Sequence, residues 1–198
     1  MRGMTETAPP APPAAPGADH HPALDFANTL LSLPAGRRDL LATPAEATDW
    51  LVERGLAPAD AELFELCTER LRGLRDQVRE LLGAAVAGAA PSPEALQAVN
   101  TALASTPSAP LLAWDESQGL HRELAHPADR VVEHAMAVLA ADAAELLTGP
   151  DAERLARCAG APCTRYLVRT HAARHWCSTR CGDRVRAARA YARRKQQG

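Results

Sequence analysis

Near its C-terminal end the 198-residue chain reads RCAGAPCTRYLVRTHAARHWCSTRC, residues 157–181. Two cysteine pairs stand in this stretch, Cys158 with Cys163 and Cys177 with Cys181, and thirteen residues separate the pairs. Each pair fits on one tight turn, and the spacer lets the second pair fold back to complete a tetrahedron around a metal ion. The stretch therefore predicts a four-cysteine zinc site.

Four cysteine ligands would make this zinc structural, because they fill the coordination sphere and leave no position for a catalytic water. Three alternatives stay open. The thiols could be unrelated or paired as disulfides, although the odd total of five cysteines argues against a fully paired framework. His171 or His175 could each replace one cysteine, and oxidation could release the metal as a redox switch. The fifth cysteine, Cys67, lies among leucines and is expected to be a buried small hydrophobe.

The residues around the cysteines predict a small treble-clef-like finger. Small residues and Pro162 allow a knuckle between the first two thiols, and residues 166–170 favour an extended strand of a hairpin. The second pair has the four-residue spacing of one helical turn, at a helix start that favours anionic ligands. The finger has few apolar side chains and is marginal alone, whereas structural zinc contributes on the order of 10–16 kcal/mol in comparable peptides.

A basic helix is predicted after the last cysteine. Arg186, Arg189 and Arg193 recur at steps of three and four residues and share one face. Val185, Ala188 and Tyr191 share another face, which is available to pack on the zinc hairpin. Arginine suits phosphates and guanine edges because its fork is planar, charged and bidentate. The residues expected to contact DNA are Arg184, Arg186, Arg189, Arg193, Arg194 and Lys195.

The charge of the chain is divided sharply along its length. Residues 151–198 hold twelve Lys or Arg against three acids, a net charge of +9, whereas residues 1–150 carry −11. This division favours a module that binds a polyanion over a helix that is basic only for solubility. No run of about 18 apolar residues occurs, which excludes a membrane span, and the first twenty residues do not read as a secretory signal. A reducing cytoplasm is expected, where clustered cysteines are typically metal ligands.

The N-terminal part reads as mostly helical. Residues 1–20 are rich in proline and alanine and are predicted to be disordered, with His20 and His21 in the flexible entry. Helices are expected over residues 23–31, from a Thr43–Glu46 capping box to Gly55, and over residues 59–82, 93–103 and 127–147. Residues 110–124 predict a hairpin, and Gly149–Pro150 marks a domain boundary.

Two further segments carry a family resemblance: residues 24–29 read LDFANT, and residues 181–184 read CGDR after Trp176, Cys177 and Ser178. Over residues 20–195 the chain resembles the bacterial CGNR zinc-finger proteins, which pair an N-terminal ABATE domain with a C-terminal finger and are described as stress-induced transcription regulators. The resemblance implies this fold and a DNA-linked role. Asp183 departs from the motif's asparagine; a carboxylate there would weaken or change a nucleic-acid contact but serves equally as a helix cap.

The ABATE signature has two interpretations. Asp25, Asn28 and Thr29 could line an effector pocket, or they could cap a helix and satisfy buried amides.

Together these observations predict a mainly α protein: a disordered tail over residues 1–20, a helical ABATE-like domain with a small β-hairpin over residues 21–149, and a CGNR-type zinc finger with a basic helix over residues 150–198. The expected function is transcription regulation through double-stranded DNA, with zinc as cofactor. The N-terminal domain would sense a signal or form a homodimer. The alternative is a zinc-stapled adaptor whose basic face docks on an acidic protein partner. We expect no enzyme activity, because the chain has no nucleotide loop, no nucleophile motif with its base and no open metal site.

Overall fold

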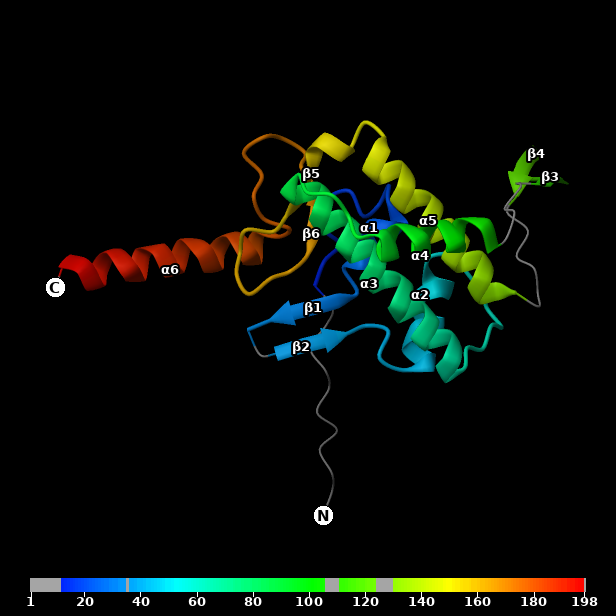
Figure 1. Ribbon diagram of the computed structural model, residues 1–198, viewed down its shortest axis with the longest axis horizontal. Helices are drawn as coiled ribbons and strands as arrows, with labels where there is room; N and C mark the ends of the chain where they lie inside the picture. Colours follow the sequence, from blue (N-terminus) through cyan, green and yellow to red (C-terminus); the bar gives the residue numbers. More distant parts are fainter. Residues whose placement is uncertain (1–11, 35, 106–110, 124–129, 198) are drawn as a thin grey trace, which may run out of the picture.

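The computed structural model describes residues 12–34, 36–105, 111–123 and 130–197 (Figure 1). Within these residues the chain forms helices and three two-stranded antiparallel hairpins, which confirms the mainly α prediction. The helices are α1 (Pro22–Ala27), α2 (Pro44–Glu53), α3 (Glu65–Ala87), α4 (Pro93–Ser105), α5 (Val131–Thr148), the short 3-10 helix η1 (Ala152–Arg154) and α6 (Thr179–Gln197). The hairpins pair β1 (Leu30–Leu33) with β2 (Gly36–Asp39), β3 (Leu111–Asp115) with β4 (Gly119–Glu123), and β5 (Leu155–Arg157) with β6 (Tyr166–Val168).

Several helix ends follow their local sequence signals. The Thr43 hydroxyl accepts from the Glu46 amide while the Glu46 carboxylate accepts from the Thr43 amide, so the capping box is confirmed. Gly55 follows α2 at φ 64°, as expected for a glycine after a helix. The predicted hairpin over residues 110–124 is present as β3 and β4; Pro110 and Leu124 lie outside the described residues.

The long helix α3 begins later and ends later than predicted. Leu63 is drawn into the core at 7% exposure, and its amide donates to the Thr48 hydroxyl, which holds the chain extended up to Phe64. At the other end, alanines carry the helix on to Gly88, which adopts φ 63°. A tertiary contact therefore sets the start, and a left-handed glycine sets the end.

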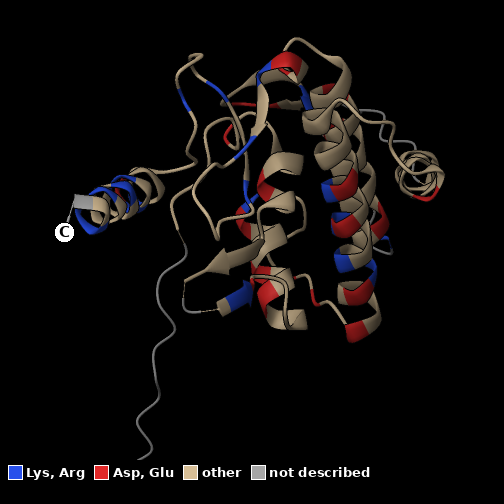
Figure 2. Cartoon of the chain, turned by 60° about the vertical axis from the view of Figure 1, so that its left-hand side comes forward, with Lys and Arg blue, Asp and Glu red and all other residues tan. Residues whose placement is uncertain are grey.

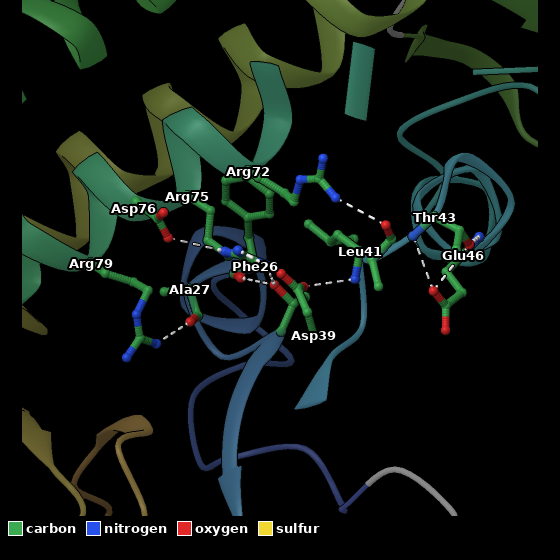
Figure 3. Close-up of polar contacts among 12 residues, drawn as sticks. Phe26, Ala27, Asp39, Leu41, Thr43, Glu46, Arg72, Arg75, Asp76 and Arg79 are labelled. Carbon is green, nitrogen blue, oxygen red and sulfur yellow. Dashed lines mark hydrogen bonds and ion pairs between the residues drawn. The ribbon is translucent and has the colours of Figure 1, made fainter. Parts of the chain in front are cut away.

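The predicted helix over residues 23–31 divides into α1 and the start of β1. The Thr29 hydroxyl donates to the Phe26 carbonyl oxygen at 2.7 Å, a local bond that competes with helix continuation. The chain then turns into the β1–β2 hairpin, which Arg75 of α3 anchors through Asp39 (Figure 3). The sequence pattern did not predict this hairpin, because its pairing is fixed by a partner on α3.

One hydrophobic core joins the helices to the C-terminal segment. Fully buried side chains of α1, α3 and α5, among them Phe26, Leu71 and Leu139, form its centre. Tyr166 and Val168 of β6 belong to the same core, at 5% and 4% exposure. The finger hairpin is therefore packed into the helical body, although the sequence divides at Gly149–Pro150.

The N-terminal segment departs from the predicted disorder from residue 12 onward. Ala15 is only 2% exposed, the Pro16 carbonyl oxygen accepts from the Val168 amide at 2.8 Å, and the Pro13 carbonyl oxygen accepts from Arg165 at 2.8 Å. The first of these bonds satisfies the Val168 amide on the outer edge of β6. Composition predicted disorder because this segment has no core of its own; the finger supplies one. Residues 1–11 lie outside the described residues.

His21 is also ordered, not part of a flexible entry. Its Nδ1 and Nε2 lie 3.0 Å and 3.2 Å from carboxylate oxygens of Asp142 and Asp151, and Asp142 accepts from the Ala23 amide. Burial acts to lower the pKa of His21, but the hydrogen bonds and charges of the two aspartates outweigh it and raise the pKa above 6.5. The imidazolium thus ties the chain entry to α5 and to the segment that leads into the finger.

We expect His21→Gln to lower the free energy of unfolding at pH 6 by about 1.5 kcal/mol, the scale of hydrogen bonds to a charged group. Because the pKa is raised in the folded state, this contribution is complete below 6.5 and disappears as the pH rises through the folded-state value. Urea unfolding of zinc-loaded wild type and variant at pH 6 and pH 9 checks this. A stability difference that stays constant or grows toward pH 9 would contradict it.

In the described part of the chain, no helix is long and apolar enough to cross a bilayer.

Candidate metal centre

The cysteines are brought together by the end of β5, a knuckle and the start of α6. The Cys158 amide donates to the Arg165 carbonyl oxygen, and the Cys163 amide donates to the Gly160 carbonyl oxygen, both at 2.9 Å, which closes the knuckle. Ser178 caps α6 by accepting from the Cys181 amide at 3.3 Å. Cys177 precedes this helix and Cys181 lies in its first turn, as the spacing predicted.

The four sulfur atoms have the spacing of a tetrahedral metal site. All four lie within 4.8 Å of one another, and Sγ of Cys177 lies 3.6 Å from that of Cys163 and 3.7 Å from that of Cys181. A tetrahedron with zinc–sulfur bonds of about 2.3 Å has sulfur–sulfur edges of about 3.8 Å. His171 and His175 are exposed and are not part of this cluster. The residues present therefore fit zinc, and they fit it as a four-cysteine site.

Without a cation the closeness of the sulfur atoms is unfavourable. Hydrogen bonds from Cys163 and Cys177 lower the pKa of Cys158, whereas the bond to Cys158 raises the pKa of Cys163 to about 11. The pKa of Cys177 is raised as well, by its bonds to Cys158 and Cys163. Four adjacent thiols therefore cannot all ionise unless a cation offsets their charge.

Two arginines face the sulfur atoms, and their positive charge partly balances the negative charge of the thiolates. Four thiolates around a divalent ion leave a net charge of −2. Arg165 is 5% exposed, and its Nη1 lies 3.9 Å from Sγ of Cys177. Nη2 of Arg184 donates to Sγ of Cys181 at 3.4 Å. The amide of Cys177 adds a donor to Sγ of Cys158 at 3.4 Å.

Arg184, one of the predicted DNA contacts, is hydrogen-bonded within the finger. Its guanidinium donates to the carbonyl oxygens of Gly160 and Ala161 at 2.6 Å and 2.9 Å, in addition to Cys181. These bonds lock the knuckle to α6. The spacing of the arginines could not predict these bonds. Arg184 lies on the same helix as the exposed arginines and differs from them only because the knuckle carbonyl oxygens lie within its reach.

The other two residues of the CGDR segment, Gly182 and Asp183, make different contacts. A Cβ on Gly182 would lie 3.1 Å from the Trp176 ring, so glycine allows the indole to pack against the helix start. Asp183 is exposed, and it accepts from Arg186 at 2.6 Å instead of capping the helix. The Arg186 guanidinium also lies 5.6 Å from the centre of the Trp176 ring.

Beyond its first two turns α6 projects from the body as a basic rod (Figures 1 and 2). Residues 186–189 and 191–196 are all exposed, and Tyr191 is 68% exposed. The prediction that Ala188 and Tyr191 pack on the zinc hairpin is therefore wrong. Lys and Arg gather on this helix, whereas acidic residues are spread over the helical body.

The ABATE signature holds the finger to the body. The Asn28 side chain donates to the carbonyl oxygen of Tyr166 at 2.9 Å and accepts from its amide at 2.8 Å, across 138 residues of sequence. The Tyr166 hydroxyl donates to the Arg79 carbonyl oxygen at 3.2 Å. Asp25, Asn28 and Thr29 do border a cavity of about 170 Å³, but Asn28 and Thr29 are hydrogen-bonded within the protein. The interpretation of satisfied buried amides is the one that the contacts support.

Two protein-family models match the chain. The ABATE model, described as "Putative stress-induced transcription regulator", matches residues 20–150. The CGNR zinc finger model matches residues 154–194, a segment that contains all four clustered cysteines and most of α6. No curated protein matches the chain.

Proposed function

The chain belongs to the ABATE family and ends in a CGNR zinc finger, and from this premise we propose that it is a cytoplasmic, non-enzymatic transcription regulator that binds double-stranded DNA through α6. Zinc holds the knuckle and the start of α6 in place, and the helical domain serves for sensing or dimerisation.

The observation that carries this proposal is the exposure of α6 on all sides beyond the finger. Its 19 residues span about 28 Å, and a helix with side chains is about 10–12 Å wide. The major groove of B-DNA is about 12 Å wide and accepts a helix of this size. Arg186, Arg189 and Arg193 share one face of this rod, and Arg194 and Lys195 extend its charge. The acidic body would be repelled from phosphates, which favours an approach by α6 first.

Salt dependence tests the DNA contact. Three arginines that each neutralise one phosphate predict a slope of about −2.7 for log affinity against log salt. We expect Arg189→Ala with Arg193→Ala to reduce that slope by about two, measured by fluorescence anisotropy with zinc-loaded protein and duplex DNA. Arg70→Gln is the matched control: Arg70 pairs with Glu133 on the acidic body, so the affinity should hardly change.

Asp183 provides a second, opposite variant in the same assay. Its carboxylate occupies Arg186 and places a negative charge on the helix. Asp183→Asn should therefore increase DNA affinity by about tenfold at low salt, while the slope stays at about −2.7 because Arg186 is already counted among the three phosphate contacts. If zinc-loaded wild type binds no duplex at low salt, the DNA proposal fails.

One observation favours the adaptor as a second candidate. Tyr191 exposes 68% of its surface on the basic helix, and exposed tyrosines next to arginines are typical of protein interfaces. In that case α6 would dock in an acidic groove of a protein partner. Tyr191→Ala would then abolish capture of the partner and leave the affinity for duplex DNA unchanged.

A further inference from the structure

A second candidate site lies within the helical domain, between the C-terminal part of α3, helix α4 and the C-terminal end of α5. The cavity measures about 320 Å³, which falls within the range of small-molecule sites in proteins. Alanines leave this space open: Ala84 on α3 and Ala144 on α5 line it together with Leu81 and Leu147. The finger and the basic helix do not contribute to its walls.

The lining selects a chemical class of ligand. None of the residues around the cavity carries a charge, so an ionised ligand would lose its hydration without gaining a partner. Two polar side chains lie at the rim. The Thr148 hydroxyl already donates to the Ala144 carbonyl oxygen, and the Asn100 side-chain amide has no partner in the described part of the chain. The lining therefore suits a neutral, largely apolar molecule with one polar group that reaches Asn100.

The cavity walls continue directly into the contacts that hold the finger. Gly83 stands between two lining residues of α3, and a Cβ at this position would lie 3.1 Å from the Tyr166 hydroxyl. Thr148 lines the cavity as the last residue of α5, and the chain then leads through Asp151, a partner of His21, into β5. A ligand that displaces the C-terminal part of α3 would therefore move the helix against which β5 and Tyr166 of β6 are packed.

We propose that this cavity is a regulatory site for a neutral, apolar small molecule, and that its occupation changes the packing of the finger hairpin on the body. The site is independent of what α6 binds. A space of about 320 Å³ accommodates a compound the size of a substituted naphthalene.

N-phenyl-1-naphthylamine, a neutral fluorescent probe, tests the site on the zinc-loaded full chain. We expect saturable binding of one probe per chain. Ala84→Leu with Ala144→Leu fills the cavity and should weaken binding by about tenfold or more, while thermal stability stays equal or rises. The matched control is Ala141→Leu, on the exposed face of α5, which should keep the wild-type affinity. Absence of saturable binding, or equal binding by the filled variant, would overturn the site.

Hydrogen–deuterium exchange tests the coupling. Saturating probe should change the exchange of the β5 and β6 amides by about threefold or more in wild type and not in the filled variant. Unchanged exchange in the presence of bound probe would overturn the coupling. Neither experiment uses DNA, so both results can be interpreted even if the DNA proposal fails.

Discussion

Cys177→Ser is expected to abolish zinc binding and to unfold the finger. Sγ of Cys177 lies 3.6 Å and 3.7 Å from the sulfur atoms of two other ligands, and a serine hydroxyl does not ionise to replace a thiolate. Structural zinc contributes on the order of 10–16 kcal/mol in peptides of this kind, far more than the few apolar contacts of the finger. Metal analysis should give one zinc per wild-type chain and none in the variant.

The same substitution should also destabilise the helical body. Tyr166 and Val168 are buried in the main core, and Asn28 bonds to the Tyr166 backbone, so release of the finger removes contacts from α1 and α3. We expect the circular-dichroism melting temperature of the whole chain to fall, with new proteolytic cleavage in residues 155–181.

Cys67→Ser is the matched control for Cys177→Ser. It replaces the one cysteine outside the cluster, which lies on α3, and should retain zinc fully. A Cys177→Ser protein that kept one zinc with wild-type affinity would contradict the four-cysteine site.

Arg75→Met is expected to destabilise the helical body by about 3 kcal/mol, the lower end of the range for breaking a buried ion pair. Arg75 is 2% exposed; it donates to both Asp39 oxygens at 2.5 Å and 2.9 Å and to the Thr29 hydroxyl at 3.3 Å (Figure 3). Its loss leaves the Asp39 carboxylate half-buried without its cation. The free energy of unfolding, measured in urea at pH 7, should fall by this amount.

The pH dependence gives an independent check on Arg75. Burial alone acts to raise the pKa of Asp39, but the hydrogen bonds and charge of Arg75 lower it below its ordinary value of 3.8. The stabilisation that the Arg75–Asp39 pair gives the wild type is therefore complete above pH 3.8. It is lost as the pH falls through the pKa of Asp39 in the folded protein. The stability difference between wild type and Arg75→Met should shrink in that acidic range.

Arg72→Met is the control on the same helix. Arg72 donates to the Ala42 carbonyl oxygen and to Glu65 at the surface, and an exposed pair of this kind contributes about 1 kcal/mol or less. If Arg72→Met and Arg75→Met lowered the free energy of unfolding equally, burial of the Arg75–Asp39 pair would not be the source of its stabilising effect.

Local patterns predicted those elements whose determinants lie within a few residues. The Thr43 capping box, the β3–β4 turn and the two cysteine pairs were read correctly, because helix caps, turns and metal knuckles depend on neighbouring side chains. Local patterns were wrong about the disorder of residues 12–20 and the flexibility of His21, and they did not predict the β1–β2 hairpin. Each is ordered by partners far along the chain: Val168 for Pro16, Arg75 for Asp39, and Asp142 for His21.

By itself, the sequence determined the ligand set and the arginine-rich helix behind it, because the spacing of cysteines and arginines limits directly where covalently linked side chains can lie. Only the tertiary structure decided what the other residues do. It turned Arg184 toward the knuckle carbonyl oxygens and left Arg189 and Arg193 exposed, and it joined Asn28 to Tyr166 across 138 residues. The physical reason is that hydrogen bonding and burial depend on what faces a side chain, and folding brings those partners from distant parts of the chain.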